Sequence, residues 1–159
     1  MAYQKLQGII GLAVIPSDFI NIPNVSDQKR SSVTGVAASG LVDGTATFTD
    51  GSVKIGDIVY DTSNSVVAKI TAITSDTELA LDNGNGVAVT IAALANYLIF
   101  SDTNKAAVLY VGVAGDLRVE MAYTGQDLTF VAAANGYHPI QVNKVFSTDT
   151  TAASIIALW

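Results

Sequence analysis

Apolar and polar residues alternate along most of this chain with a period of two, which is the spacing of half-buried β-strands. The alternation is cleanest in the last third. Residues 117–121 read Leu-Arg-Val-Glu-Met, and residues 128–130 repeat the pattern after the turn signal Thr124-Gly125. This pair predicts a hairpin with one buried face. Residues 106–111 are continuously apolar, and we expect that strand to be covered on both faces.

The middle of the chain, residues 36–101, carries short strand patterns separated by Asp-Gly, Ser-Asn and Asn-Gly turn signals. The predicted strands are 41–42, 46–48, 58–60, 66–73, 77–81, 87–91 and 97–100. Strands that recur at roughly 8–12-residue spacing favour a sandwich or a barrel. Helix patterns are confined to two short stretches, 91–96 and 151–155.

The N-terminal region divides into a strand and an irregular stretch. Residues 8–15 form an apolar strand pattern that stops at Pro16, which cannot donate to a ladder. That strand has no local partner, so we expect it to pair with strands after Lys105. Residues 16–34 are rich in turn formers and predict an extended arm or a linker. We expect the apolar residues of this arm to lie along a neighbouring subunit. They are Phe19, Ile20, Ile22 and Val25.

These patterns predict an all-β fold, an antiparallel β-sandwich or barrel. Its base sheet combines the N-terminal strand with the C-terminal segment, and a small β-module is inserted between them. The expected division is 1–35 for the N-terminal strand and arm, 36–101 for the inserted module and 102–159 for the C-terminal domain. We also expect Trp159, the last residue, to be tied into a sheet and to contact another subunit.

Composition narrows the classes of function. Only 14% of residues are charged, against roughly 25% in typical soluble domains. A surface with few charges can lie against other subunits with little desolvation of charge. The net charge is −6 and the only basic cluster is Lys29-Arg30, which argues against nucleic-acid binding. The longest apolar stretch, 87–100, is broken by polar residues and falls short of the ~18 needed to span a membrane.

Candidate catalytic and metal-binding residues are few. The chain has no cysteine and one histidine, so disulfides and the usual zinc sets are excluded within one chain. His138 lacks a nucleophile motif and an orienting acid. The Gly-rich stretches and residues 82–85 lack the context of a phosphate loop or a calcium loop and predict turns. We therefore expect no cofactor and no metal.

Paired carboxylates are the remaining catalytic possibility. Asp57 and Asp61 flank a predicted strand, and Asp43 and Asp50 lie in turn signals. Glycosidase chemistry needs two carboxyl groups set across a substrate groove. Aspartates in Asp-Gly, Gly-Asp and Asp-Thr dipeptides instead accept local backbone hydrogen bonds. The turn role is favoured, and the chain is not expected to be an enzyme.

Tyrosines near loop ends offer a different possibility. Most aromatic residues fall inside strand patterns, where packing in the core or against another subunit is the default. Tyr123 and Tyr137 lie near the ends of predicted loops instead. These two are the candidates for stacking on a glycan.

Three parts of the chain resemble structural proteins of cyanobacterial and related tailed bacteriophages. The first is GLAVIPSDFINIP at 11–23. The second comprises LVDGTATF at 41–48, VKIGDIVY at 53–60 and ITSDTELAL at 73–81. The third comprises LYVGVAGDLR at 109–118, TDTTA at 148–152 and the terminal IALW. In such proteins the middle β-module looks like an insertion between an N-terminal strand and a C-terminal sheet.

The resemblance implies a virion component, and a capsid decoration (cement) protein on the outer surface of the head is the leading expectation. Its partners would then be the major capsid protein, other virion proteins and further copies of itself, with a trimer favoured. The alternatives are a neck, tail, baseplate or fibre-base protein, and a carbohydrate-binding adhesion module.

Overall fold

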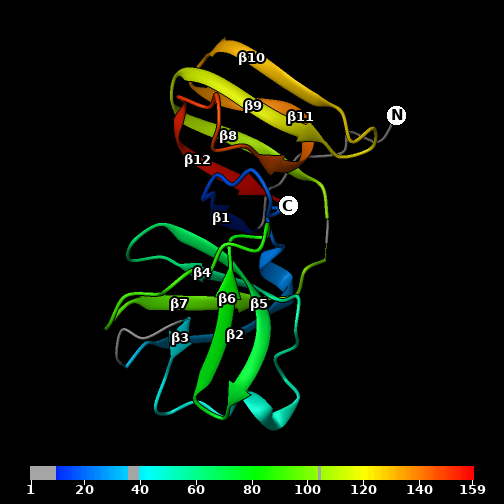
Figure 1. The fold of residues 1–159 in the computed structure, drawn as a ribbon. Coiled ribbons are helices and arrows are strands. Elements are labelled where there is room, and N and C mark those ends of the chain that lie inside the picture. Colours follow the sequence, from blue (N-terminus) through cyan, green and yellow to red (C-terminus); the bar gives the residue numbers. More distant parts are fainter. Residues whose placement is uncertain (1–9, 36–39, 104) are drawn as a thin grey trace.

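The computed structural model describes residues 10–35, 40–103 and 105–159, which form two six-stranded antiparallel sheets (Figure 1). The C-terminal sheet has the strand order β1-β12-β8-β11-β9-β10. Its strands are β1 (Gly11–Ala13), β8 (Ala107–Val113), β9 (Gly115–Met121), β10 (Asp127–Ala133), β11 (Gly136–Val145) and β12 (Ala153–Leu158). The central sheet has the order β2-β7-β4-β5-β6-β3. Its strands are β2 (Gln28–Val33), β3 (Leu41–Val42), β4 (Ile58–Asp61), β5 (Val66–Ser75), β6 (Glu78–Asp82) and β7 (Asn96–Phe100). The all-β prediction is confirmed.

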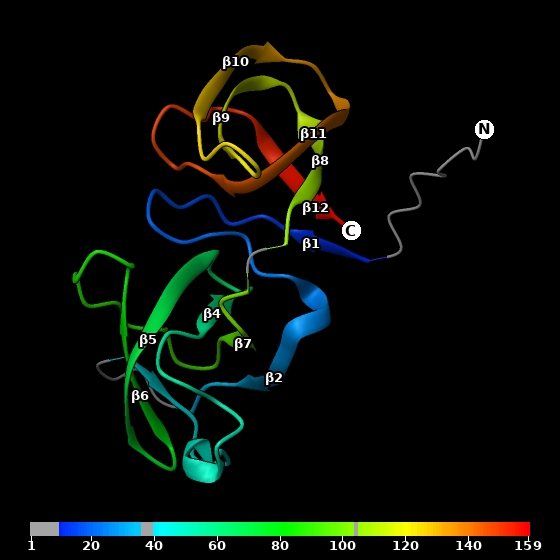
Figure 2. The same cartoon turned by 90° about the vertical axis from the view of Figure 1, so that its right-hand side faces the viewer.

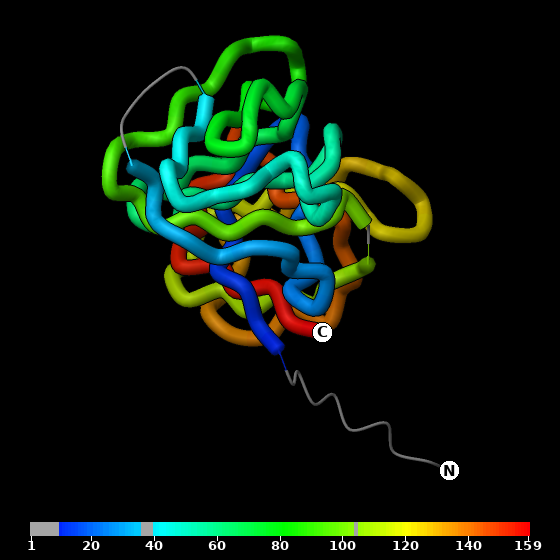
Figure 3. The backbone as a smooth tube through the Cα atoms, turned by 90° about the horizontal axis from the view of Figure 1, so that it is seen from below, coloured from blue at the N-terminus to red at the C-terminus, as the bar shows by residue number. Residues whose placement is uncertain are grey.

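The N-terminal strand completes the C-terminal sheet, as predicted. β1 pairs antiparallel with β12, and the two run side by side in blue and red in Figure 3. The backbone N–H of Trp159 donates to the Ile10 carbonyl at 3.2 Å. Its indole N–H donates to the Lys105 carbonyl at 2.8 Å. Trp159, which follows β12, is therefore hydrogen-bonded to the segments that lead into β1 and β8, the two strands beside β12.

The C-terminal sheet curls into a half-barrel because one long stretch of chain wraps around β11. A single residue, Ala114, separates β8 from β9, yet the two strands are not neighbours. Val142 of β11 lies opposite Ala107 of β8 and also opposite Met121 of β9. The start of β8 and the end of β9 thus flank the same strand, and the segment between them forms the curved wall.

Two glycines let the chain turn at this wall without a steric clash. A Cβ atom at Gly112 would lie 2.8 Å from the Cβ of Ser154. A Cβ atom at Gly115 would lie 2.5 Å from the backbone nitrogen of Ala152. The segment leading into β12 therefore approaches the β8–β9 wall more closely than any larger residue would allow.

In the central sheet, β4 and most of β7 are buried on both faces. In β4 and β7 one set of alternate side chains, including Tyr60 and Phe100, joins a core shared with the C-terminal sheet. The other set, including Val59, Tyr97 and Ile99, forms a second core within the central sheet and its loops. Figure 2 shows the two sheets stacked, with the segment that follows β1 passing between them.

That segment corrects the prediction of an extended arm over 16–34. It folds onto its own chain and ends in a short 3-10 helix, η1 (Val25–Asp27), and in β2, which pairs with β7. The backbone N–H of Ser17 donates to the Val145 carbonyl at 2.9 Å, and that of Ile22 donates to the Asn143 carbonyl at 2.8 Å. Because β2 reads Gln-Lys-Arg-Ser-Ser-Val, it has no apolar alternation from which a strand could be predicted.

Four other local predictions are wrong. The stretch 91–96 is not helical, because the Ile91 N–H donates to the carbonyl of the distant Gly40 and the chain then turns into β7. Part of 151–155 belongs to β12 instead of a helix. Residues 46–48 lead into a 3-10 helix, η2 (Phe48–Asp50), which turns the Phe48 ring into the second core. Residues 87–91 make only an isolated bridge, between Asp82 and Ala88.

The continuous apolar run 106–111 is covered on one face only. Ala107, Leu109 and Val111 point into the shared core, whereas Val108 and Tyr110 are half-exposed on the other side of β8. The helices of the described residues are the two 3-10 turns, and none there is long and apolar enough to cross a membrane.

Candidate binding surface

The aspartates considered for catalysis serve the turns in which they lie. Asp57 accepts from the Lys54 N–H at 2.7 Å and pairs with the Lys29 ammonium at 2.7 Å. Asp61 is fully buried, and its Oδ1 accepts from the backbone N–H groups of Ser63 at 2.9 Å and Asn64 at 3.0 Å. Asp50 accepts from both the N–H and the hydroxyl of Ser52. These carboxylates accept hydrogen bonds that stabilise the loops in which they lie.

The polar loop at 82–85 and the single histidine are likewise engaged locally. Asp82 accepts from the N–H groups of Gly84 at 2.8 Å and of Gly86 at 3.0 Å, which closes the turn between β6 and the bridge residue. The His138 ring nitrogen Nε2 lies 2.9 Å from the Ala134 carbonyl. Within the described residues, His, Asp and Glu side chains form no group of three that could hold a metal ion.

The residues predicted to contact other subunits fall into three classes. Ile20 and Ile22 are 5% and 3% exposed and belong to the shared core, so their side chains are not free to contact another protein. Val25 and Trp159 are half-buried against the same core. Phe19 is half-exposed beside Gly84 and remains accessible. The apolar period of this segment reflects packing within the chain.

A surface that the sequence did not single out lies on the outside of the C-terminal sheet. Residues directly opposite each other in an antiparallel ladder share a face, so the strand register defines a row across four strands. The row consists of Ala13, Ile156, Tyr110 and Tyr137. A second row, two residues along, consists of Gly11, Leu158, Val108 and Gln141. We call these two rows the outer face.

The outer face carries no charged side chain. β1, β8 and β12 contain no Asp, Glu, Lys or Arg at all, and in β11 the first charged residue is Lys144, beyond both rows. Ile156 is 38% exposed and Tyr137 is 73% exposed. The rings of Tyr110 and Tyr137 meet edge to face with centroids 5.3 Å apart. A neutral, largely apolar sheet face is thus open to solvent in a chain of net charge −6.

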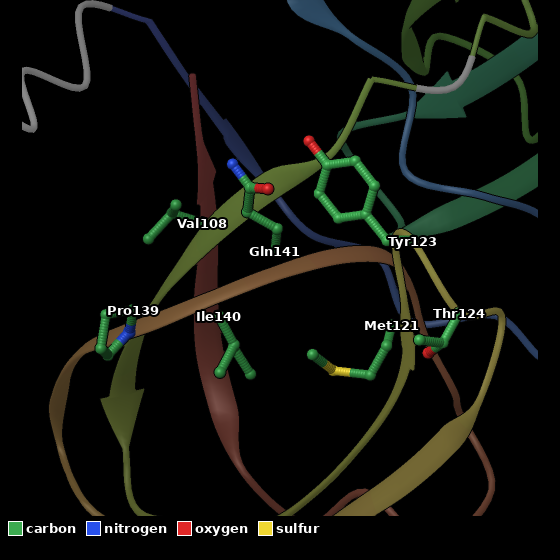
Figure 4. A pocket seen from close by; sticks show the side chains of 7 residues that line it. All are labelled: Val108, Met121, Tyr123, Thr124, Pro139, Ile140 and Gln141. Atoms are coloured by element: carbon green, nitrogen blue, oxygen red, sulfur yellow. The ribbon is translucent and has the colours of Figure 1, made fainter.

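An open hollow of about 430 Å³ overlaps the second row, because Val108 and Gln141 of that row line it (Figure 4). It is lined by Val108, Met121, Tyr123, Thr124, Pro139, Ile140 and Gln141. Two local features create it. The register of β11 slips between His138 and Gln141, next to a proline that cannot donate to the ladder, and the turn after β9 reverses at Gly125 with φ +63°.

The structure separates the two tyrosines proposed for glycan contact. Tyr123 is 86% exposed and lines the hollow together with Gln141 (Figure 4). Tyr137 does not line the hollow, and its ring packs edge to face against Tyr110. The other lining residues were missed by sequence reasoning. Pro139 within a strand pattern was the one signal of a bulge that could have indicated them.

No protein-family model, no curated protein and no solved structure matches this chain.

Proposed function

We propose that this protein is a non-enzymatic structural component of a tailed-phage virion that decorates the outer surface of the head and stabilises it. The resemblance to phage structural proteins touches most of the chain and supports a virion component as the class of protein. The observation that carries the proposal is the outer face. An exposed, uncharged sheet face suits a protein that works by lying against another protein.

The size of the outer face is modest. Strands lie ~4.8 Å apart and rise ~3.3 Å per residue, so two rows across four strands present roughly 200 Å² in projection. A patch of this size is ordinary on a soluble monomer, so the proposal depends on its lack of charge and on contacts added up over many copies. Because no charge needs to be desolvated, docking costs little of the solvation energy that charged surfaces lose.

The proposed partner is the major capsid protein, with further copies of the chain, in a trimer, as neighbours. Each copy would contribute a modest contact, and many copies on one shell would stabilise it together. β1 and β10 are the edge strands of the C-terminal sheet within the described residues, and they offer backbone groups through which adjacent copies can pair. The commitment of the buried aspartates to turns supports a mechanical role over a catalytic one.

The first test is the number of copies per particle, measured by quantitative mass spectrometry of purified virions against the major capsid protein. Decoration of the whole head predicts a ratio near one, or one trimer per few capsomers. A handful of copies would assign the chain to the neck, tail, baseplate or a fibre base instead. Absence from virions would refute the proposal.

The second test places a charge on the outer face. Ile156→Lys puts an ammonium at the centre of the first row and should abolish binding of the purified protein to particles that lack it. Leu94→Lys is the matched control, because Leu94 is 76% exposed on a loop of the central sheet away from this face. Both variants should unfold at the wild-type temperature. Equal binding by Ile156→Lys and wild type would exclude the outer face as the docking surface.

A further inference from the structure

We propose that the hollow beside Tyr123 binds a neutral saccharide. The inference does not rest on the virion role, because saccharide binding at this hollow can be measured on the purified protein without any particle.

The charge of the hollow selects the class of ligand. None of the seven lining residues is acidic or basic, so the site has neither a cation for a phosphate, sulfate or carboxylate group nor an anion for a metal or amine. The net charge of −6 further disfavours an anionic ligand. A ligand that fits must be uncharged.

The shape and lining favour a sugar ring over a purely apolar ligand. A volume of about 430 Å³ lies at the lower end of the ~300–1,000 Å³ typical of small-ligand sites, and the hollow is open instead of enclosed. Tyr123 offers an exposed aromatic face, on which the C–H groups of a pyranose can stack. Pro139 and Ile140 provide an apolar floor.

Hydroxyl groups of a sugar would find partners at the rim. Gln141 is exposed and carries an amide that both donates and accepts. The Thr124 hydroxyl oxygen accepts from the Gln126 N–H at 3.3 Å, which leaves its own proton to donate. The Tyr123 hydroxyl adds a third polar group. This combination of one aromatic face and a few neutral donors and acceptors matches the two kinds of surface that a neutral sugar presents.

The experiment is an NMR titration of ¹⁵N-labelled full-length protein. The probes are neutral oligosaccharides of hexose and N-acetylhexosamine units, with a sialylated oligosaccharide as the charged comparison. We expect at least one neutral oligosaccharide to shift the amide signals of residues 121–124 and 139–141. The sialylated probe should bind more weakly or not at all.

Matched variants locate the site. Tyr123→Ala should weaken binding about tenfold or more, because it removes the stacking face. Tyr137→Ala removes a tyrosine of similar exposure on the same sheet and should leave the affinity within about twofold. Gln141→Leu keeps the shape of the rim and removes its amide, so it provides a second variant should Tyr123→Ala perturb the fold. The proposal is overturned if no neutral oligosaccharide shifts these signals, or if Tyr123→Ala and Gln141→Leu both bind as wild type does.

Discussion

Asp43 shows how a single buried carboxylate is kept charged in this fold. It is 1% exposed, and it accepts hydrogen bonds from the Thr45 N–H at 2.9 Å, the Thr45 hydroxyl at 2.7 Å and the Tyr97 hydroxyl at 2.7 Å. Burial alone would raise the pKa of this carboxyl, but the hydrogen bonds outweigh burial and lower the pKa to about 2. Burial and the nearby Asp43 charge raise the pKa of Tyr97, so its hydroxyl stays protonated and keeps donating.

This pKa shift predicts a defined pH dependence of stability. The pKa of Asp43 is lower in the folded protein than the ~3.9 of an unfolded chain, so its contribution is complete above about pH 4 and is lost as the pH falls toward 2. The size of the shift corresponds to roughly 2 kcal/mol. We expect Asp43→Asn to lower the free energy of unfolding by about this amount at pH 7, and the difference from wild type to shrink between pH 4 and pH 2. Urea unfolding at several pH values measures it.

A matched substitution tests whether burial matters. Asp50 makes the same kind of turn with Ser52 but is exposed, so Asp50→Asn should destabilise the protein less than Asp43→Asn. If the two variants lose equal stability at pH 7, the effect belongs to the turn and not to the buried bond with Tyr97.

For single residues, the sequence predicts the role that a side chain plays in its own turn. It does not predict which residue far along the chain that side chain contacts. The turn function of Asp43 follows from the dipeptide Asp43-Gly44, but its bond to Tyr97, 54 positions along the chain, depends on how the sheet is ordered. For the same reason Ile20 and Ile22 were predicted to lie along a neighbouring subunit, whereas they pack in the core of their own chain. A sequence shows that a residue is apolar, and only the fold shows what covers it.

Among the elements, the bent wall formed by β8 and β9 depends most directly on one residue type. Gly115→Ala would place a methyl group 2.5 Å from the Ala152 nitrogen, where backbone atoms cannot yield easily. We expect a loss of about 1–3 kcal/mol from the resulting strain. Gly44→Ala is the control, because a Cβ there meets nothing within 4 Å. Thermal unfolding should separate the two variants, and equal melting temperatures would mean that the wall relaxes freely.

The elements also show where the period-two pattern reaches its limit. β9 was predicted nearly to the residue. Its side chains alternate between the buried core and the more accessible face, and this gives the sequence a clean period of two. β2 was missed because it lies at a sheet edge and is polar throughout its first five residues. The hollow beside Tyr123 was missed because it arises from a slip in register, and register is a relation between two strands.

In the whole molecule, the two sheets share one core. Tyr60 and Phe100 of the central sheet pack edge to face, with ring centroids 5.8 Å apart and planes at 84°. Both belong to the same buried cluster as Leu109 and Val119 of the C-terminal sheet. The segment after β1 passes between the sheets and adds Ile20 and Ile22 to that cluster. The insertion inferred from the sequence is therefore continuous in its packing with the sheet that carries it.

A shared core predicts that both sheets unfold in one transition, which a distant reporter can test. Trp159 is the only tryptophan and is anchored at the edge of the C-terminal sheet, so its fluorescence follows that sheet. Ile99 belongs to the other core, within the central sheet, and Ile99→Val should cost about 0.5–1.5 kcal/mol. If the sheets unfold together, this substitution lowers the urea midpoint seen by Trp159 fluorescence as much as the midpoint seen by far-UV circular dichroism. Phe100→Ala, in the shared core, should lower both by a larger amount. An Ile99→Val midpoint that moves by circular dichroism but not by fluorescence would mean that the central sheet unfolds on its own.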